Sequence, residues 1–243
     1  MDLIKELKSF FSVSRLSSIS DIYKSMIPGF DKSVACYRRT DKFKFDEYSL
    51  FTFLRIGELD VLKQNVSSFE KSDKKELILQ LKQLTKEPQP DLHKIREILN
   101  QNGIYFSFLP KNLDKLPVNG LVRYYKDNPL LQLTGRGKYT DIFWFNLFHE
   151  LGHIYKHLKK KDAFLDGEHI TGSVDSEEEA NGFANDMLID KNDYELLKNN
   201  LTEKKALAVA RKNNIHPGIV IGRLAHDKLA NWKIAERYRY KMI

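Results

Sequence analysis

The feature that most limits the possible folds of this chain is a change in hydrophobic spacing near its middle. In the first part, apolar residues recur every three or four positions, which is typical of amphipathic helices. Three short, largely apolar segments follow, bounded by Pro, Gly and Asn, and two of them are rich in aromatic residues. Helical spacing then returns. This order predicts a mainly helical α+β fold with a small three-stranded sheet.

The same spacing gives approximate bounds for the expected elements. Two helical pieces are expected within residues 1–28, and residues 30–45 are expected to be irregular or extended. The expected strands are residues 104–109, 121–125 and 130–133, and the other expected helices are 46–66, 73–85, 91–102, 139–158, 174–189 and most of 202–239.

Composition excludes several classes of protein. Hydrophobic residues make up 42% of the 243 residues, which is enough for a core and excludes global disorder. The longest apolar runs are about five residues, whereas a membrane-spanning helix needs about 20. The charged N-terminus does not resemble a signal peptide, and Cys36 is the single cysteine. We therefore expect a cytoplasmic protein without a membrane partner. The net charge of +7 is interspersed, so DNA binding by this chain alone is not expected.

The motif that carries chemistry lies within the helix expected at 139–158. His149 and His153 are four residues apart, so both imidazoles project from one helix face and can bind one metal ion. Glu150 lies close enough to accept a proton from a metal-bound water, and is the candidate catalytic base. His157 is about 12 Å along the axis from His149, too far for both to reach the same ion.

A third ligand is expected from the acidic run that begins the helix at 174–189. Glu177 is the preferred ligand, with Glu178 and then Glu179 as alternatives. Asn181 is four residues after Glu177, so it can hold a ligating imidazole by a hydrogen bond. Two histidines and a glutamate on a second helix are the thermolysin type of zinc site, so one Zn²⁺ is the expected cofactor, although other divalent metals can use these ligands.

Three blocks of sequence resemble the ImmA/IrrE family of zinc peptidases. They are FHELGHIYKH, EEEANGFANDMLI and NNIHPGIVIGRLAHD. The family pattern implies His149 and His153 as ligands and Glu150 as general base, and its leading glutamate falls on Glu177. One departure is Asp190, which stands where the family has proline after its second block. The resemblance covers roughly residues 35–230 and implies a zincin-like fold in which the small sheet packs on the helix that carries the His-Glu-x-x-His motif.

Two further segments, at residues 38–60 and 120–153, look like the C-terminal half of long HigA-type antitoxins and related transcription regulators. In those proteins a helix-turn-helix DNA-binding domain usually comes first, and this chain begins about where the following linker helix would begin. We expect the following units: an N-terminal helical arm at 1–40, a helical segment packed on the core at 41–103, a metallopeptidase core at 104–190 and a C-terminal helical segment at 191–243.

These features lead to two hypotheses about function. The first is a metalloendopeptidase of narrow specificity that acts on a repressor-like regulatory protein. The second is a regulatory module that binds a partner such as a toxin and retains a peptidase-like metal site. For the first, the strand at 129–134 is expected to lie along the cleft and pair with substrate. The residue that would stabilise the oxyanion is not identified; the candidates are His169, His216, Tyr139 and Arg223, each of which is better explained by a structural role. Residues 204–227 also have the spacing of a helix-turn-helix, which is common in plain helical hairpins.

Overall fold

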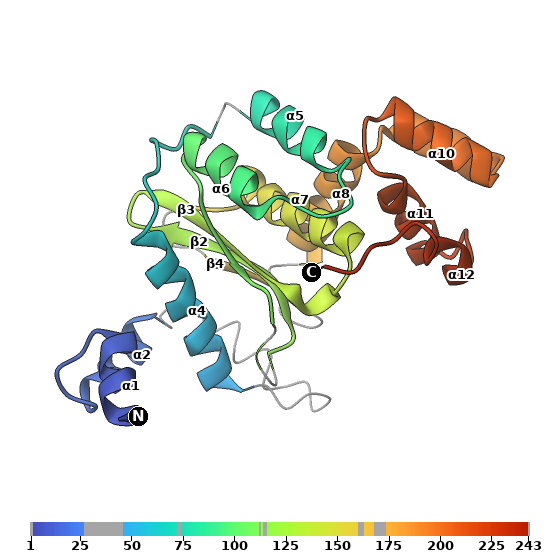
Figure 1. Cartoon of the computed structure of the whole chain (residues 1–243). Helices are drawn as coiled ribbons and strands as arrows, with labels where there is room; N and C mark the ends of the chain where they lie inside the picture. The colour runs from blue at the N-terminus through green and yellow to red at the C-terminus, as the bar shows by residue number, and fades with distance from the viewer. Residues whose placement is uncertain are drawn as a thin grey trace.

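A computed structural model describes residues 2–26, 46–71, 74–111, 113, 116–159, 163–167 and 174–242. Its α+β architecture is mainly helical, which confirms that expectation (Figure 1). The strands are β1 (Tyr105–Leu109), β2 (Val118–Tyr125), β3 (Asn128–Thr134) and β4 (Ala163–Gly167). The helices are α1 (Leu3–Phe11), α2 (Ser18–Met26), α4 (Glu47–Val61), α5 (Lys75–Leu84), α6 (Leu92–Gln101), α7 (Thr140–Lys156), α8 (Val174–Leu188), α9 (Lys191–Asn199), α10 (Glu203–Lys212), α11 (Pro217–His226) and α12 (Trp232–Ala235).

The sheet contains the three expected strands and a fourth, β4, that was not expected. Its strand order is β1-β3-β2-β4. β3 pairs in parallel with β1 and antiparallel with β2, while β4 pairs antiparallel with β2. The prediction that the strand at 129–134 pairs with substrate is therefore wrong. Both backbone edges of β3 are already used by neighbouring strands, and β4 forms the edge of the sheet beyond β2.

The two faces of the sheet are covered by different helices, because side chains alternate along a strand. Leu131 and Leu133 lie in the main core with residues of α5, α6, α7 and α8. On the other face, the Gln132 side chain donates to the carbonyl of Phe53 in α4 at 2.9 Å, and Leu121 packs in a second, smaller core with α4. The sheet thus lies between α4 and the helices that carry the candidate metal ligands (Figure 1).

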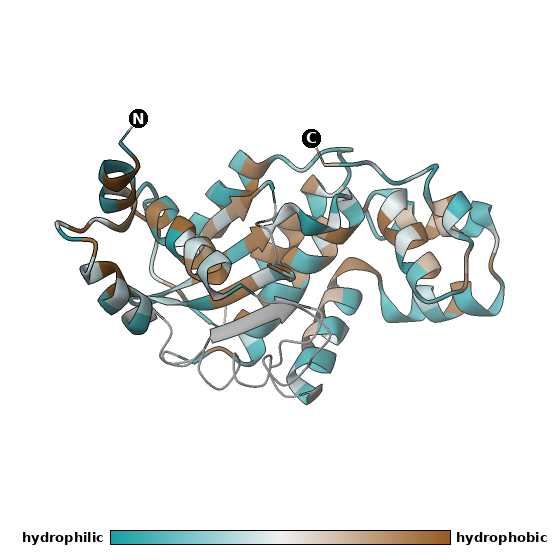
Figure 2. Ribbon diagram, turned by 90° about the horizontal axis from the view of Figure 1, so that it is seen from below, coloured by the Kyte–Doolittle hydropathy of each residue, from teal (hydrophilic) through white to brown (hydrophobic). Residues whose placement is uncertain are grey.

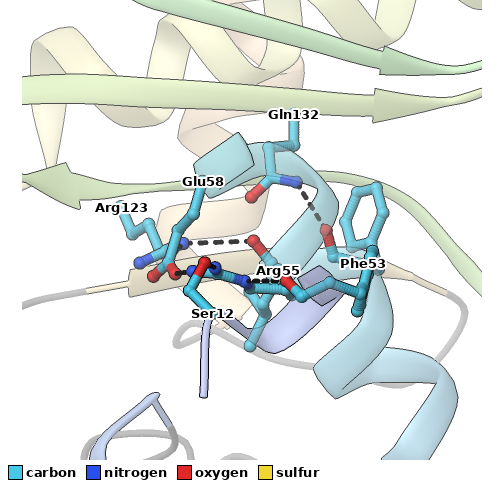
Figure 3. A network of polar contacts seen from close by, with 8 residues as sticks. Ser12, Phe53, Arg55, Glu58, Arg123 and Gln132 are labelled. Atoms are coloured by element: carbon cyan, nitrogen blue, oxygen red, sulfur yellow. Dashed lines mark hydrogen bonds and ion pairs between the residues drawn. The ribbon is translucent and has the colours of Figure 1, made fainter. Parts of the chain in front are cut away.

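A polar network joins the end of α1 to α4 and the sheet (Figure 3). Glu58 of α4 pairs with Arg55 at 3.0 Å and with Arg123 of β2 at 3.2 Å. Arg55 also donates to the Phe10 carbonyl at 2.9 Å and to the Ser12 hydroxyl at 2.9 Å, where α1 ends. The side chains of all three charged residues are at most 16% exposed, so each depends on the others for compensation of its charge.

Aspartates begin several of the helices. Asp46, Asp91 and Asp190 accept hydrogen bonds from the first backbone N–H groups of α4, α6 and α9, respectively. Asp190 is the residue that departs from the family pattern, and its capping role explains how α9 can begin with only two residues between it and α8. The sequence analysis expected a helical C-terminal segment at 191–243 but no separate helix at 191–199, where only three residues of α9 are buried, among them Tyr194 and Leu197.

Apolar positions gather in the sheet and in the helices beside it, while polar positions are common on the outlying helices (Figure 2). No helix within the described part of the chain is long and apolar enough to cross a membrane. The expectation of an irregular segment at 30–45 lies outside the described residues.

Gly103, between α6 and β1, provides a test of this packing. Its φ of +78° is strained for any residue with a side chain, and a Cβ there would lie 2.4 Å from the Phe69 Cα. We expect Gly103→Ala to lower the free energy of unfolding by about 2 kcal/mol or more, measured by urea denaturation. In Gly182→Ala a Cβ in α8 meets nothing within 4 Å, so this control is expected to raise stability by about 0.5–1 kcal/mol. Equal effects of the two substitutions would contradict the geometry at Gly103.

Candidate metal centre

Helix α7 places two histidines deep in the protein. It packs against β2, β3 and α8, and 13 of its 17 residues are buried. His149 and His153 are 2% and 0% exposed, and their Nε2 atoms lie 3.0 Å apart. A spacing of four residues puts them one above the other on the same face of the helix. Burying an imidazole is unfavourable unless its nitrogen atoms have partners, so these two rings need polar groups around them.

Helix α8 supplies a carboxylate to the same point. One oxygen of Glu177 lies 3.3 Å from His149 Nε2, and its other oxygen lies 3.3 Å from His153 Nε2. The two helices approach closely because small residues meet: a Cβ on Gly152 would lie 3.1 Å from the Ala180 Cα. This close contact brings Glu177 within reach of both imidazoles.

The three side chains form a group that could hold a metal ion. Their potential ligand atoms all lie within 4.8 Å of one another. In a tetrahedral site with metal–ligand distances of about 2.0–2.2 Å, neighbouring ligand atoms are about 3.3–3.6 Å apart, which is close to the 3.0–3.3 Å separations found here. The chemistry also fits, since a carboxylate and two imidazole nitrogens bring lone pairs to one point, and a cation relieves their repulsion.

Asn181, one turn after Glu177, fixes the orientation of the first imidazole. Its Oδ1 lies 3.0 Å from His149 Nδ1. With the amide oxygen as acceptor, Nδ1 carries the proton and Nε2 presents its lone pair toward Glu177 and His153. The structure thus places Asn181 where the sequence analysis expected it to support His149.

Among the three glutamates at the start of α8, only Glu177 reaches the histidines. Burial alone would raise the pKa of Glu177, but the adjacent imidazoles of His149 and His153 outweigh it and lower the pKa to about 2. This carboxyl is therefore ionised at neutral pH. Glu178 is exposed, and Glu179 instead lies 3.7 Å from Lys156 and 3.8 Å from His157.

Glu150 lies against a strand residue that the sequence analysis did not identify. Its side chain is fully buried, and a Cβ on Gly120 of β2 would lie only 2.1 Å from Glu150 Oε1. Only glycine at this position leaves room for the carboxylate. An isolated glycine within a strand often marks such a close approach, so the signal was present in the segment VNGLVRYY.

The candidates for oxyanion stabilisation have structural roles in the described chain. His216 caps α11 by accepting from the Gly218 N–H, and the Tyr139 ring lies 4.0 Å beneath the Arg239 guanidinium. Arg223 lies 3.6 Å above the Tyr194 ring and also borders a cavity beside α8. His169 lies outside the described residues.

The segment considered as a helix-turn-helix forms α10 and α11. Helix α11, which would have to enter a DNA groove, has seven of its ten residues buried, including Val220 and Leu224. This burial gives it the character of a core helix.

No model of a known protein family matches this chain, and a search of curated proteins found no match.

The glutamate assignment can be tested by metal affinity. Glu177→Gln removes the ionised carboxylate that faces both histidines, so we expect affinity for Zn²⁺ to fall by about 100-fold or more, as measured by competition with a chromogenic chelator. Glu178→Gln is the matched control, because Glu178 is the next residue but is exposed, and it should bind normally. A larger loss of Zn²⁺ affinity in the Glu178→Gln variant would assign the ligand to Glu178 instead.

Proposed function

We propose that the chain is a zinc-dependent metalloendopeptidase of narrow specificity. The observation that carries this proposal is the convergence of His149, His153 and Glu177, with Glu150 adjacent to the first histidine on the same helix. Two histidines and a glutamate leave a fourth position of a tetrahedral ion for water or substrate, which is how catalytic zinc sites differ from structural ones. The resemblance to the ImmA/IrrE family and a zincin-like fold are part of this proposal.

The bound ion would polarise a peptide carbonyl and make water more acidic. Glu150 acts as the general base: its carboxylate accepts a proton from the attacking water and then delivers that proton to the leaving amine. Glu150 is buried beneath Gly120, which limits its movement and excludes bulk water from one side. Asn181 keeps His149 in the tautomer that leaves Nε2 available.

The sheet suggests where an extended substrate would lie. Gly120, which contacts Glu150, pairs with Asp166 of β4. In the described part of the chain, β4 is the edge strand on this side of the sheet. A peptide that adds to β4 would therefore lie two strands from the catalytic base. This docking edge replaces the one expected at 129–134, and it suits an extended segment of a regulatory protein such as a repressor.

Replacing Glu150 with Gln separates catalysis from metal binding. The amide keeps the size of the side chain but is not a base, so cleavage should fall by about 10²-fold or more. The test is to incubate zinc-containing wild-type and Glu150→Gln proteins with the proteins encoded beside this chain's gene, and to follow cleavage by mass spectrometry. Metal content, measured in parallel, should be unchanged.

Two results would contradict the peptidase proposal. Equal cleavage by both forms would show that Glu150 is not the base. A tight complex between the wild type and a neighbouring protein, without cleavage, would instead favour the regulatory module that binds a partner through a retained metal site.

Gly120→Ala tests the position of Glu150 without changing it chemically. The added methyl group meets the end of a flexible side chain, so the Glu150 carboxylate should shift while the fold persists. A displacement of this kind is expected to lower the cleavage rate by about 10²-fold with little change in zinc affinity. Gly182→Ala on α8, where a Cβ has open space, is the control. Full activity in the Gly120 variant would show that the position of the Glu150 carboxylate against β2 does not matter for the reaction.

A further inference from the structure

A cavity of about 720 Å³ lies beside the candidate metal centre. It is bordered by the first half of α7, the second half of α8, α11 and the C-terminal segment. Asn181 and Phe145 connect it to the centre: Asn181 contacts His149, and the Phe145 ring centroid is 6.1 Å from that of His149. Its size is that of a small-molecule or side-chain binding pocket.

One face of α7 carries apolar side chains from the cavity to the first candidate metal ligand. Ile142, Phe145 and His149 follow one another at intervals of three and four residues, so they lie in a row along the helix. Ile142 and Phe145 border the cavity and are half-buried, so part of their apolar surface is left open there. A side chain that packs on this row would bring its own backbone close to His149.

The other walls of the cavity are also largely apolar. Trp232 of α12 borders it and is 46% exposed, although tryptophan has one of the largest apolar surfaces of any side chain. Leu188 of α8 and Ile219 of α11 border it as well and are almost fully buried. Apolar side chains from α7, α8, α11 and α12 therefore meet at one hollow, and a ligand that covers them removes apolar surface from water.

The most buried charges at the cavity already have partners. Arg239 Nε donates to Asp141 at 2.8 Å, and the two side chains are only 7% and 9% exposed, so neither presents its charge to a ligand. Asp227 accepts from the Tyr194 hydroxyl at 2.6 Å, and Arg223 lies 3.8 Å from the same carboxylate oxygen. A charged ligand would lose water without gaining an ion pair from these groups, which is unfavourable.

Arg136 is the charged side chain that bears on the remaining choice of ligand. It borders the cavity, and its guanidinium donates to Asn119 Oδ1 at 3.2 Å. Its positive charge disfavours a cationic ligand. An acidic side chain is accordingly the competitor against which an apolar one has to be measured.

We propose that this cavity binds a large apolar side chain of the polypeptide substrate. Removing such a side chain from water supplies binding free energy and requires no hydrogen bond in return. The assignment to a substrate rests on the proposed peptidase function, whereas the preference of the cavity for apolar groups does not. Ile142 is then a specificity-determining residue, because it contacts the substrate side chain without holding the metal.

The test uses N-acetyl-L-phenylalanine methylamide as a probe on the full chain. Trp232 borders the cavity and Trp144 is buried elsewhere in the core, so the two indole N–H signals in a ¹⁵N NMR spectrum report binding and provide an internal reference. We expect the probe to shift the Trp232 signal in a saturable way, with and without a metal chelator. The glutamine, glutamate and lysine analogues should bind about tenfold more weakly or less, because their polar ends lose water in the cavity.

Ile142→Asn places a polar group in the apolar row, and should weaken binding of the phenylalanine probe by about fivefold or more. Leu79→Asn, the same kind of change at an exposed position of α5 outside the cavity, is the control and should bind normally. An unchanged Trp144 signal in both variants shows that the core is folded, and the comparison of probes on the wild type needs no variant.

Three results would overturn the proposal: equal binding of the glutamine or glutamate probe, no saturable shift with the phenylalanine probe, or unchanged binding by a folded Ile142→Asn variant. Because these measurements need neither metal nor turnover, their outcome is independent of whether Glu150 supports cleavage.

Discussion

The close contact between α7 and α8 is the constraint on which the candidate site depends. Gly152 and Ala180 have little or no side chain, so the two helices can pack closely enough for Glu177 to reach both histidines. A larger residue at Gly152 would meet the backbone of Ala180, which cannot move aside as a flexible side chain can. The metal-binding geometry is therefore determined by helix packing as well as by the three side chains themselves.

The part of the site that sequence could predict is the part set by local spacing. The four-residue intervals between His149 and His153, and between Glu177 and Asn181, specify a shared helix face wherever the helices lie. Helix periodicity and short β-rich segments likewise predicted the mainly helical α+β architecture. Glu177 was preferred over its neighbours by the same argument, and the structure brings that residue to the imidazoles.

The features that sequence could not predict are those that depend on contacts between distant segments. The order of strands in the sheet is one of them, because β1 lies beside β3 and not beside β2, which follows it in sequence. Nothing in residues 129–134 indicates that both edges of that strand are occupied. The proximity of Gly120 to Glu150 depends on how α7 crosses β2, and the few apolar residues of α9 did not distinguish that helix from a polar connection.

The candidate metal ligands and the candidate base depend on the same helix, and this has a physical consequence. Asn181 of α8 holds the His149 imidazole, while Gly120 of β2 leaves just enough room for the Glu150 carboxylate. Both side chains are therefore positioned by elements that the packing of α7 on α8 and on the sheet already fixes. For the proposed reaction, rigid placement of a base beside the metal ligands would contribute to rate, because less orientational freedom remains to be lost in the transition state.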